Sequence, residues 1–350
     1  MIAKSIPRLN RKITARERSP KPGARIGSSM ATKKILFVTL TNIGDVILTL
    51  PSLDFLRERF PGARFTVICG PRAAGFFASS PAVERCIPYD KHAPLRAKIR
   101  LFRDLRKERF DLVVDFRNSL FGWLLNPICR APFIPSLAGI HAYRQYLEIA
   151  RAVAGGGGTA ARVAPCSIFV SPEDKARVEA LFAAHGCAAR KIIAVSPGCR
   201  GREKRWSRDN FRELCGLMAA ETGSAVVLLG DGGDTEATAY IAGGCRDVID
   251  LAGKTTLAQL AYVLTRSELL VANDSANMHL AGYLDVPTVA ILGPTDERRY
   301  GPWAGRTAVA RRGLSCSPCP HGECARGRPE CMEISAGEVM ARIRRMRDNG

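Results

Sequence analysis

From Lys34 onward, short apolar runs alternate with longer amphipathic segments, and this alternation limits the possible folds more than any other feature. Short apolar runs are typical of buried strands, and the segments between them are long enough for helices that return across a sheet. The sequence therefore predicts an α/β fold built on parallel strands. The expected strands are residues 35–40, 64–69, 111–115, 192–196, 225–229, 268–272 and 288–292. The expected helices are residues 51–60 and 95–108 and segments that begin at Arg208, Thr235, Leu257 and Ser275.

The pattern falls into two similar halves. At 350 residues the chain is long for one domain, and the glycine run 155–158 interrupts the periodicity. We place the boundary between residues 155 and 172, because Ser171 and Pro172 are typical of a helix cap and a first helical position. We expect Rossmann-like domains at 33–160 and 171–334 that face a cleft, and a C-terminal helix within 335–350.

The first 29 residues differ from the rest. They hold eight Lys or Arg against Glu17, contain Ser and Pro, and have few large apolar residues. We expect this tail to be disordered, without the apolar core of a secretory signal. Met30 is followed directly by Ala-Thr-Lys-Lys-Ile-Leu, so we expect translation to begin there.

The charge balance indicates anionic partners. The formal net charge is +19, of which the tail accounts for +7 and the remainder of the chain for +12. Nucleotide diphosphates, a phosphorylated glycolipid or an anionic membrane surface would suit such a protein. Nucleic acid is not expected, since aromatic residues make up 7% and no binding motif is present. No apolar stretch is long enough for a transmembrane helix.

The stretch 273–303 is typical of a phosphate site. Asn273, Asp274 and Ser275 lie at a helix start directly after an apolar strand. The first amides of a helix lack intrahelical partners and carry the positive end of the helix dipole, so they can hold a diphosphate. Many α/β folds use this geometry, so by itself it does not identify an enzyme class.

With residues 33–51, the stretch resembles glycosyltransferase family 9, the ADP-heptose:lipopolysaccharide heptosyltransferases. Residues 33–51 form a strand, a loop and an apolar helix from about Asp45, and Gly44 and Asp45 match the family's Gly-Asp pair. Asp274, Ser275, Met278 and His279 match its donor signature, while Ala276 and Asn277 replace the usual glycine and proline. The resemblance extends over residues 33–345.

The resemblance implies a GT-B fold and an inverting transfer of heptose, or a related sugar, from ADP-heptose to lipopolysaccharide core or a similar glycolipid. It also implies a C-terminal helix that crosses back to the first domain, and a cytoplasmic enzyme peripheral to the inner face of the inner membrane. Asp45 would be the base that takes the acceptor proton. The plainer interpretation is a helix cap. Thr41, Asn42 and Gly44 would line the acceptor side or shape the turn.

The loop 196–206 is rich in cations and glycines. The family places a Pro-Gly turn and a Lys-Arg-Trp element here, matched by Pro197, Gly198, Lys204, Arg205 and Trp206. We expect Lys204 to stabilise the leaving nucleoside diphosphate, as a fixed cation is most effective where negative charge develops. A solvated basic loop is the alternative. The other residues expected to bind the donor are Ser196, Gly198, Arg205, Asp231, Asp234, Asp274, Ser275, Ala276, Met278, His279, Thr295 and Asp296.

Several of these assignments keep an alternative. Asp231 or Asp234 could accept from ribose hydroxyls, but both also suit a plain turn. For His279 a structural role, or one beside the phosphates, is favoured over catalysis. No Asp-x-Asp element lies at a strand end, so we expect transfer without a metal, with Lys204 and helix amides in its place.

The chain holds twelve cysteines, four of them close together in sequence. Cys316, Cys319, Cys324 and Cys331 have the spacing C-x2-C-x4-C-x6-C. A structural zinc site, disulfides and free thiols all remain open for them. The other eight are scattered among apolar segments and are expected to be buried thiols.

Two other classes of function remain. A nucleotide-sugar epimerase shares the fold but needs no acceptor site, and a non-catalytic nucleotide- or glycan-binding protein would explain Ala276 and Asn277. A dehydrogenase is not expected, because no G-x-G-x-x-G follows the first strand.

Overall fold

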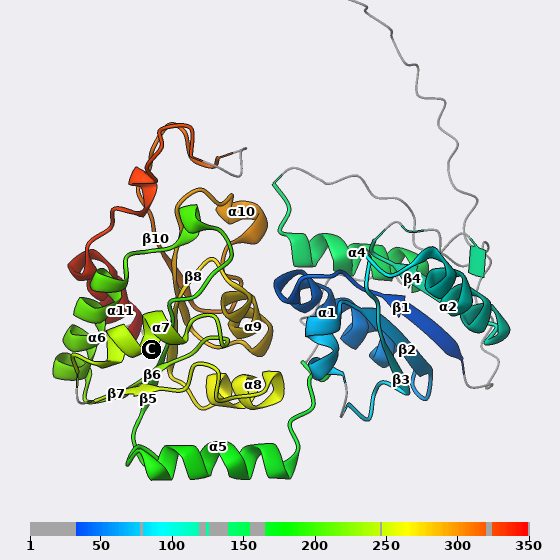
Figure 1. Cartoon of the computed structure of the whole chain (residues 1–350), viewed down its shortest axis with the longest axis horizontal. Helices are drawn as coiled ribbons and strands as arrows, with labels where there is room; N and C mark the ends of the chain where they lie inside the picture. Colours follow the sequence, from blue (N-terminus) through cyan, green and yellow to red (C-terminus); the bar gives the residue numbers. More distant parts are fainter. Residues whose placement is uncertain are drawn as a thin grey trace, which may run out of the picture.

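Two parallel sheets organise the molecule. The computed structural model describes residues 33–77, 80–117, 119, 124–125, 139–154, 165–245, 247–319 and 324–348. The tail 1–29, Met30 and the glycine run 155–158 lie outside these residues. The described part forms two α/β units side by side (Figure 1). The GT-B expectation is confirmed in this arrangement.

The first sheet has the strand order β3-β2-β1-β4, and every neighbouring pair is parallel. Its strands are β1 (Lys34–Val38), β2 (Arg64–Cys69), β3 (Arg85–Pro88) and β4 (Leu112–Asp115). Helices α1 (Ile43–Arg59) and α4 (Ala142–Ala154) pack against each other and cover one face, while α2 (Leu95–Lys107) covers the other. A 3-10 helix, η1 (Pro71–Phe76), follows β2.

The second sheet has the strand order β10-β9-β8-β5-β6-β7, again with parallel neighbours. Its strands are β5 (Ile192–Ser196), β6 (Ala225–Leu228), β7 (Val248–Asp250), β8 (Leu269–Asn273), β9 (Thr288–Ile291) and β10 (Thr307–Ala310). The α-helices of this unit are α5 (Pro172–Ala184), α6 (Arg208–Thr222), α7 (Thr235–Ala242), α8 (Leu257–Thr265), α9 (Ala276–Leu284), α10 (Glu297–Tyr300) and α11 (Ala336–Asp348). Two short 3-10 helices are η2 (Arg202–Lys204) and η3 (Glu330–Met332).

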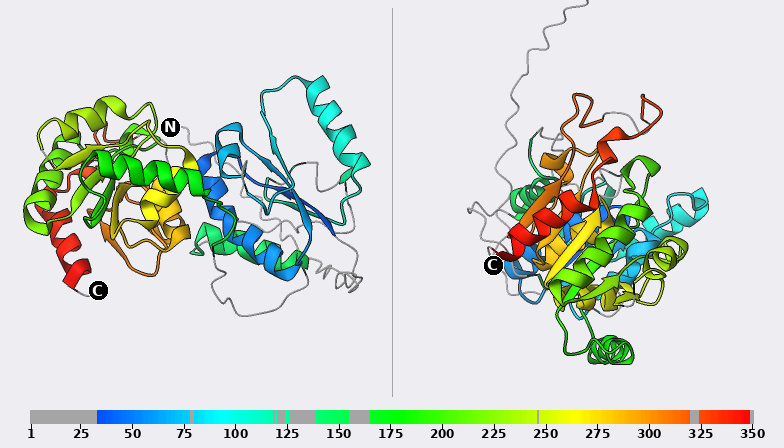
Figure 2. Two further views of the ribbon diagram at one scale, coloured as in Figure 1. Left: turned by 90° about the horizontal axis from the view of Figure 1, so that it is seen from below. Right: turned by 90° about the vertical axis from the view of Figure 1, so that its left-hand side faces the viewer.

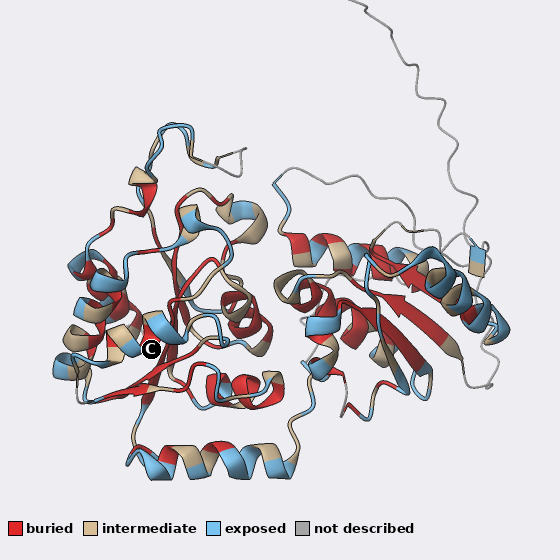
Figure 3. Ribbon diagram, viewed as in Figure 1, coloured by how far each residue is buried: buried red, intermediate tan, exposed pale blue. Residues whose placement is uncertain are grey.

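The apolar core is continuous between the two units. The inner strands of both sheets are almost wholly buried, whereas the edge strands β3 and β10 are only partly so (Figure 3). One cluster of buried side chains includes Ile47 and Leu50 of α1 together with Met278 and Leu280 of α9. Contact between α1 and α9 therefore joins the domains by apolar packing as well as by the chain itself.

The C-terminal helix does not return to the first domain. The buried side chains of α11 belong to a cluster that lies within the second unit, and α11 packs on α6, β9 and β10. Arg344 pairs with Glu221 of α6 at 2.7 Å, and Figures 1 and 2 show α11 on the side of the second sheet away from the first. The expected crossing is therefore wrong. None of the described helices is long and apolar enough to span a membrane.

Candidate active site

The first turns of α1 and α9 meet where the two domains touch. Strand β1 leads into α1 through residues 39–42, and β8 leads into α9 through Asp274 and Ser275. Gly44 lies at the contact: a Cβ there would be 3.3 Å from Cδ2 of His279 and 3.6 Å from Cα of Ala276. The absence of a side chain at Gly44 allows two helix N-termini, each with unpaired amides, to approach the same place.

Asp45 lies in the first turn of α1 and is half-buried. Its Oδ2 accepts a hydrogen bond from Nδ2 of Asn42 at 2.9 Å, and Oδ1 of Asn42 accepts from a guanidinium nitrogen of Arg200 at 2.6 Å. Asn42, the residue before α1, makes no side-chain bond to the helix amides. Asn42 thus connects Asp45 to the cationic loop of the second domain.

Thr41 shapes the same loop through its main chain. A Cβ on Gly70 would overlap the carbonyl of Thr41, and the amide of Gly70 donates to the carbonyl of Leu40 at 3.1 Å. The end of β2 therefore supports the loop that carries Asn42. For Thr41, this favours the role in shaping the turn.

Lys204, Asp274 and Thr295 form a compact polar group. Nζ of Lys204 lies 2.6 Å from Oδ2 of Asp274, and the Thr295 hydroxyl donates to the same oxygen at 2.5 Å. Asp274 is 9% exposed, whereas the Lys204 side chain is 39% exposed. The carboxylate therefore holds a partly accessible ammonium beside the N-terminus of α9. Such fixed positive charge suits an anionic ligand.

Two buried polar atoms at the start of α9 have no hydrogen-bond partner among the described residues: Oγ of Ser275 and Nδ1 of His279. Burial lowers the pKa of His279 to about 4, although the charge of Asp274 opposes this shift. The imidazole is therefore neutral at pH 7. Since buried polar groups are ordinarily paired, these two atoms suit a ligand that approaches the helix amides.

Other residues expected at the donor site mainly stabilise it. The Asn277 side chain donates to the Ser196 hydroxyl at 2.9 Å, which ties α9 to the end of β5. Met278 is fully buried in the core, which favours packing for its side chain. Asp296 caps α10 by accepting from the amide of Arg298. Arg205 turns back to the carbonyl of Cys199 at 3.3 Å.

The two acids of the Gly-rich turn after β6 have different surroundings. Asp231 pairs with Arg72 of the first domain at 2.7 Å. Asp234 accepts from the amide of Asp231 at 3.0 Å, and a Cβ on Gly198 would overlap its carboxylate. Burial raises the pKa of Asp234. Asp234 therefore fits the turn interpretation, while Asp231 links the domains.

An aromatic contact between the domains was not expected from the sequence. The Tyr143 ring of α4 stacks on Trp303 with centroids 4.3 Å apart, and Nε2 of His141 lies 3.0 Å from the carbonyl of Gly301. Burial lowers the pKa of His141. Trp303 is the last residue of the stretch 273–303, so its place in that stretch was one signal that it could lie near the site. Nothing local in the sequence pairs it with Tyr143.

The four clustered cysteines are all among the described residues, and each is a free thiol. All eleven described cysteines are free thiols, and no group of three or more metal-ligating side chains is found in the described ranges. Cys331 is buried beside Gly293, whereas Cys316 is exposed. The structure thus gives no support to the zinc alternative and favours free thiols.

Comparisons with known proteins agree on one family. A family model described as glycosyltransferase family 9 (heptosyltransferase) matches residues 158–328, which include the cationic loop and α9. Lipopolysaccharide heptosyltransferase 1 of Pseudomonas aeruginosa is 28% identical over 321 residues, covering 83% of this chain and 87% of the relative.

Solved structures share the fold. The Escherichia coli ADP-heptose LPS heptosyltransferase II matches with a TM-score of 0.71 and 22% identity, covering 89% of this chain and 98% of that one. A more distant match is the iron-containing dodecameric glycosyltransferase TibC of enterotoxigenic E. coli, with a TM-score of 0.55 and 14% identity. That match covers 91% of this chain and 77% of TibC.

Proposed function

The chain belongs to glycosyltransferase family 9, and we propose that it transfers heptose, or a related sugar, from an ADP-activated donor to lipopolysaccharide core or a similar glycolipid. One observation carries the proposal: the first turns of α1 and α9 meet at Gly44, with Asp45 on one side and Lys204, Ser275 and His279 on the other. The meeting point offers a carboxylate and an anion site from different domains. The names of the relatives suggest ADP-heptose and lipopolysaccharide.

The donor diphosphate would lie at the N-terminus of α9. The amides of the first turn and the ammonium of Lys204 supply positive charge, and Asp274 with Thr295 fixes that ammonium. The unpartnered Oγ of Ser275 can donate to a phosphate oxygen. As the bond between sugar and phosphate breaks, its electron pair goes to the diphosphate. The positive charge of Lys204 and of the α9 amides then stabilises the departing ADP.

Asp45 would act as the base of an inverting displacement. The acceptor hydroxyl attacks the anomeric carbon from the face opposite the diphosphate, and its proton passes to the Asp45 carboxylate. The Asn42 amide, held by Arg200, orients that carboxylate. Closure of the two domains would exclude water from the reacting sugar.

We propose that this transfer needs no metal ion. Lys204 and the α9 amides would carry the charge that a divalent cation carries in other sugar transfers. Activity that persists in excess chelator is the expected result. Loss of activity in chelator, with recovery on adding back one metal, would contradict it. The enzyme would work in the cytoplasm at the inner face of the inner membrane, where such an acceptor is assembled.

The test is ADP release from ADP-heptose in the presence of a truncated, water-soluble lipopolysaccharide core acceptor. Asp45→Asn is compared with Asp209→Asn, which makes the same change in the first turn of α6. We expect acceptor-dependent release that Asp45→Asn abolishes and Asp209→Asn leaves near the wild-type rate. UDP- and GDP-sugars are run in parallel to identify the nucleotide.

Other outcomes have definite meanings. Donor binding without any turnover would support the non-catalytic interpretation. Conversion of the donor sugar without acceptor would support an epimerase. Turnover that Asp45→Asn leaves unchanged would remove Asp45 from the mechanism but keep the transfer.

A further inference from the structure

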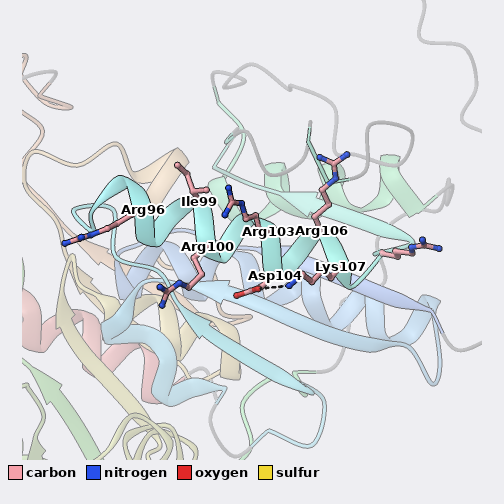
Figure 4. Close-up of a pocket in the computed structure, with 8 residues that line it drawn as sticks. Arg96, Ile99, Arg100, Arg103, Asp104, Arg106 and Lys107 are labelled. Carbon is pink, nitrogen blue, oxygen red and sulfur yellow. Dashed lines mark ion pairs between the residues drawn. The ribbon is translucent and has the colours of Figure 1, made fainter.

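Helix α2 packs on the outer face of the first sheet, but only a small part of the helix surface is buried in this contact. Among its thirteen residues, all of them described, Leu105 alone is fully buried, whereas α1 buries ten. Leu105 joins a small apolar cluster with Leu36, Val38 and Ile68 of the sheet. Most of α2 therefore faces outward, away from the sheet (Figure 4).

The outward side of α2 is strongly cationic. The hollowed surface along the helix is lined by Arg96, Arg100, Arg103, Arg106, Lys107 and Arg109, with Asp104 as its one acid. Asp104 forms a pair with Lys107 at 3.7 Å. Within the described ranges the other five cations have no ion pair. Figure 4 shows Arg103 and Arg106 projecting from one side of the helix and Arg100 and Lys107 from the other.

Exposed apolar side chains accompany this charge. Leu95 is 72% and Ile99 42% exposed, and since they are four residues apart they lie on one side of the helix. Leu124 is 52% exposed, and its neighbour Leu125 packs against the same small cluster as Leu105. Of the five large apolar residues exposed in the described part of the chain, three thus belong to this region. Cations beside exposed aliphatic side chains are typical of a helix that lies in the surface of a bilayer.

We propose that this outward face of α2, the basic α2 surface, binds a lipid bilayer that carries anionic headgroups. The cations would contact the headgroups, and Leu95 and Ile99 would enter the boundary with the acyl chains. No aromatic side chain is exposed on α2 for stacking on bases, so a nucleic acid fits this surface less well. The inference extends the proposed function, because a glycolipid acceptor would be presented at such a surface.

The experiment is co-sedimentation of the full chain with vesicles of phosphatidylcholine and phosphatidylglycerol, beside vesicles of phosphatidylcholine alone. We expect binding to the anionic vesicles that weakens as salt is raised. Each cation removed from the surface should weaken binding roughly fivefold. The triple variant Arg96→Glu, Arg103→Glu and Lys107→Glu should therefore lose binding by more than about a hundredfold.

A matched triple variant controls for net charge. Lys175→Glu, Arg177→Glu and Arg345→Glu make the same charge change at exposed positions of α5 and α11. These variants keep the basic tail, so a contribution from residues 1–29 is the same in all of them. The control should bind like the wild type. The pair Leu95→Ser and Ile99→Ser should weaken binding at every salt concentration.

Three results would overturn the inference: no binding of the wild type to anionic vesicles, equal loss in both triple variants, or full binding by the Leu95→Ser and Ile99→Ser pair. ADP release with the water-soluble acceptor separates this inference from the proposed function. The α2 triple variant should keep that turnover. If the wild type binds vesicles but neither it nor any variant turns over the donor, the role of the basic α2 surface is supported and the proposed transferase activity is contradicted. If the wild type turns over the donor but does not bind vesicles, the transferase activity is supported and the role of the basic α2 surface is contradicted.

Discussion

The hydroxyl of Tyr283 donates a 2.6 Å hydrogen bond to the carboxylate of Asp54, 229 residues away in the sequence. Asp54 lies in α1 of the first domain and Tyr283 in α9 of the second, and both are buried. Ser167, which lies in the segment between the two domains, donates its hydroxyl to Asp54 and its amide to the Tyr283 oxygen. One buried carboxylate thus connects both domains and the segment that joins them.

Replacing Tyr283 with Phe should destabilise the protein. The change removes one donor from buried Asp54 and one acceptor from the Ser167 amide, so we expect a loss of about 1–3 kcal/mol in the free energy of unfolding. Tyr262→Phe is the control, since its hydroxyl contacts Glu179, which also pairs with Arg266 nearer the surface. Urea unfolding followed by circular dichroism measures both. Equal effects of the two changes would contradict a special role for the buried contact.

The same carboxylate should give stability an unusual dependence on pH. Burial raises the pKa of Asp54 above its ordinary 3.8, against the opposing effect of its hydrogen bonds. At pH values between 3.8 and the raised pKa of the folded state, Asp54 holds a proton in the folded chain that it has lost in the unfolded chain. Stability from this group is therefore present at low pH and is lost as pH rises through the folded pKa. The wild-type advantage over Asp54→Asn should shrink as pH rises above 3.8. A constant difference in urea midpoint across that range would disprove it.

The sequence predicts the buried elements well because burial shapes their composition. The expected strands 64–69 and 192–196 have the bounds of β2 and β5, and α6, α7 and α8 begin at the predicted Arg208, Thr235 and Leu257. The missed strands are β3, β7 and β10, and all three lie at sheet edges. Strands β3 and β10 are mostly half-buried or exposed, so they lack a continuous apolar run, and β7 is only three residues long.

Two helices show other limits. Helix α1 begins at Ile43 and continues through Pro51, where the expected helix 51–60 began, although the loop-to-helix pattern pointed to a start near Asp45. Helix α4 was not among the expected helices, although its sequence is amphipathic. The position of α11 depended on resemblance alone, and its own apolar side chains pack within the second domain.

Within the candidate site, the sequence identifies residues but not their partners. Lys204 and Asp274 were each expected at the donor, yet their 2.6 Å pairing joins segments 70 residues apart. The bond between Arg200 and Asn42 joins different domains. Such contacts depend on how segments far apart in the sequence are brought together in the fold. The spacing of residues within one segment does not indicate this. A buried acid within the apolar run of α1 was the available signal for Asp54.

His279 should leave a second, opposite dependence on pH. Its folded pKa is lowered to about 4 from the ordinary 6.5, mainly by burial. As pH falls from 6.5 towards 4, the unfolded chain takes up a proton that the folded chain does not, so wild-type stability should decrease. His279→Gln should lack this component, and exposed His185→Gln should keep it. Thermal melts across this interval measure the difference. Identical slopes for the wild type and His279→Gln would contradict the neutral buried imidazole.

Lys204 should act on the chemical step more than on donor binding. Its ammonium is already balanced by Asp274 at 2.6 Å, so its attraction for the donor is greatest when the departing diphosphate gains charge. Lys204→Met should lower kcat by about 10²–10³-fold with a smaller change in KM for the donor. Lys191→Met, at the opposite end of β5, removes a mostly exposed lysine and should leave both constants near their wild-type values. A rise in KM with unchanged kcat would instead assign Lys204 to uniform binding of the donor, because the cation would then contact substrate and transition state equally.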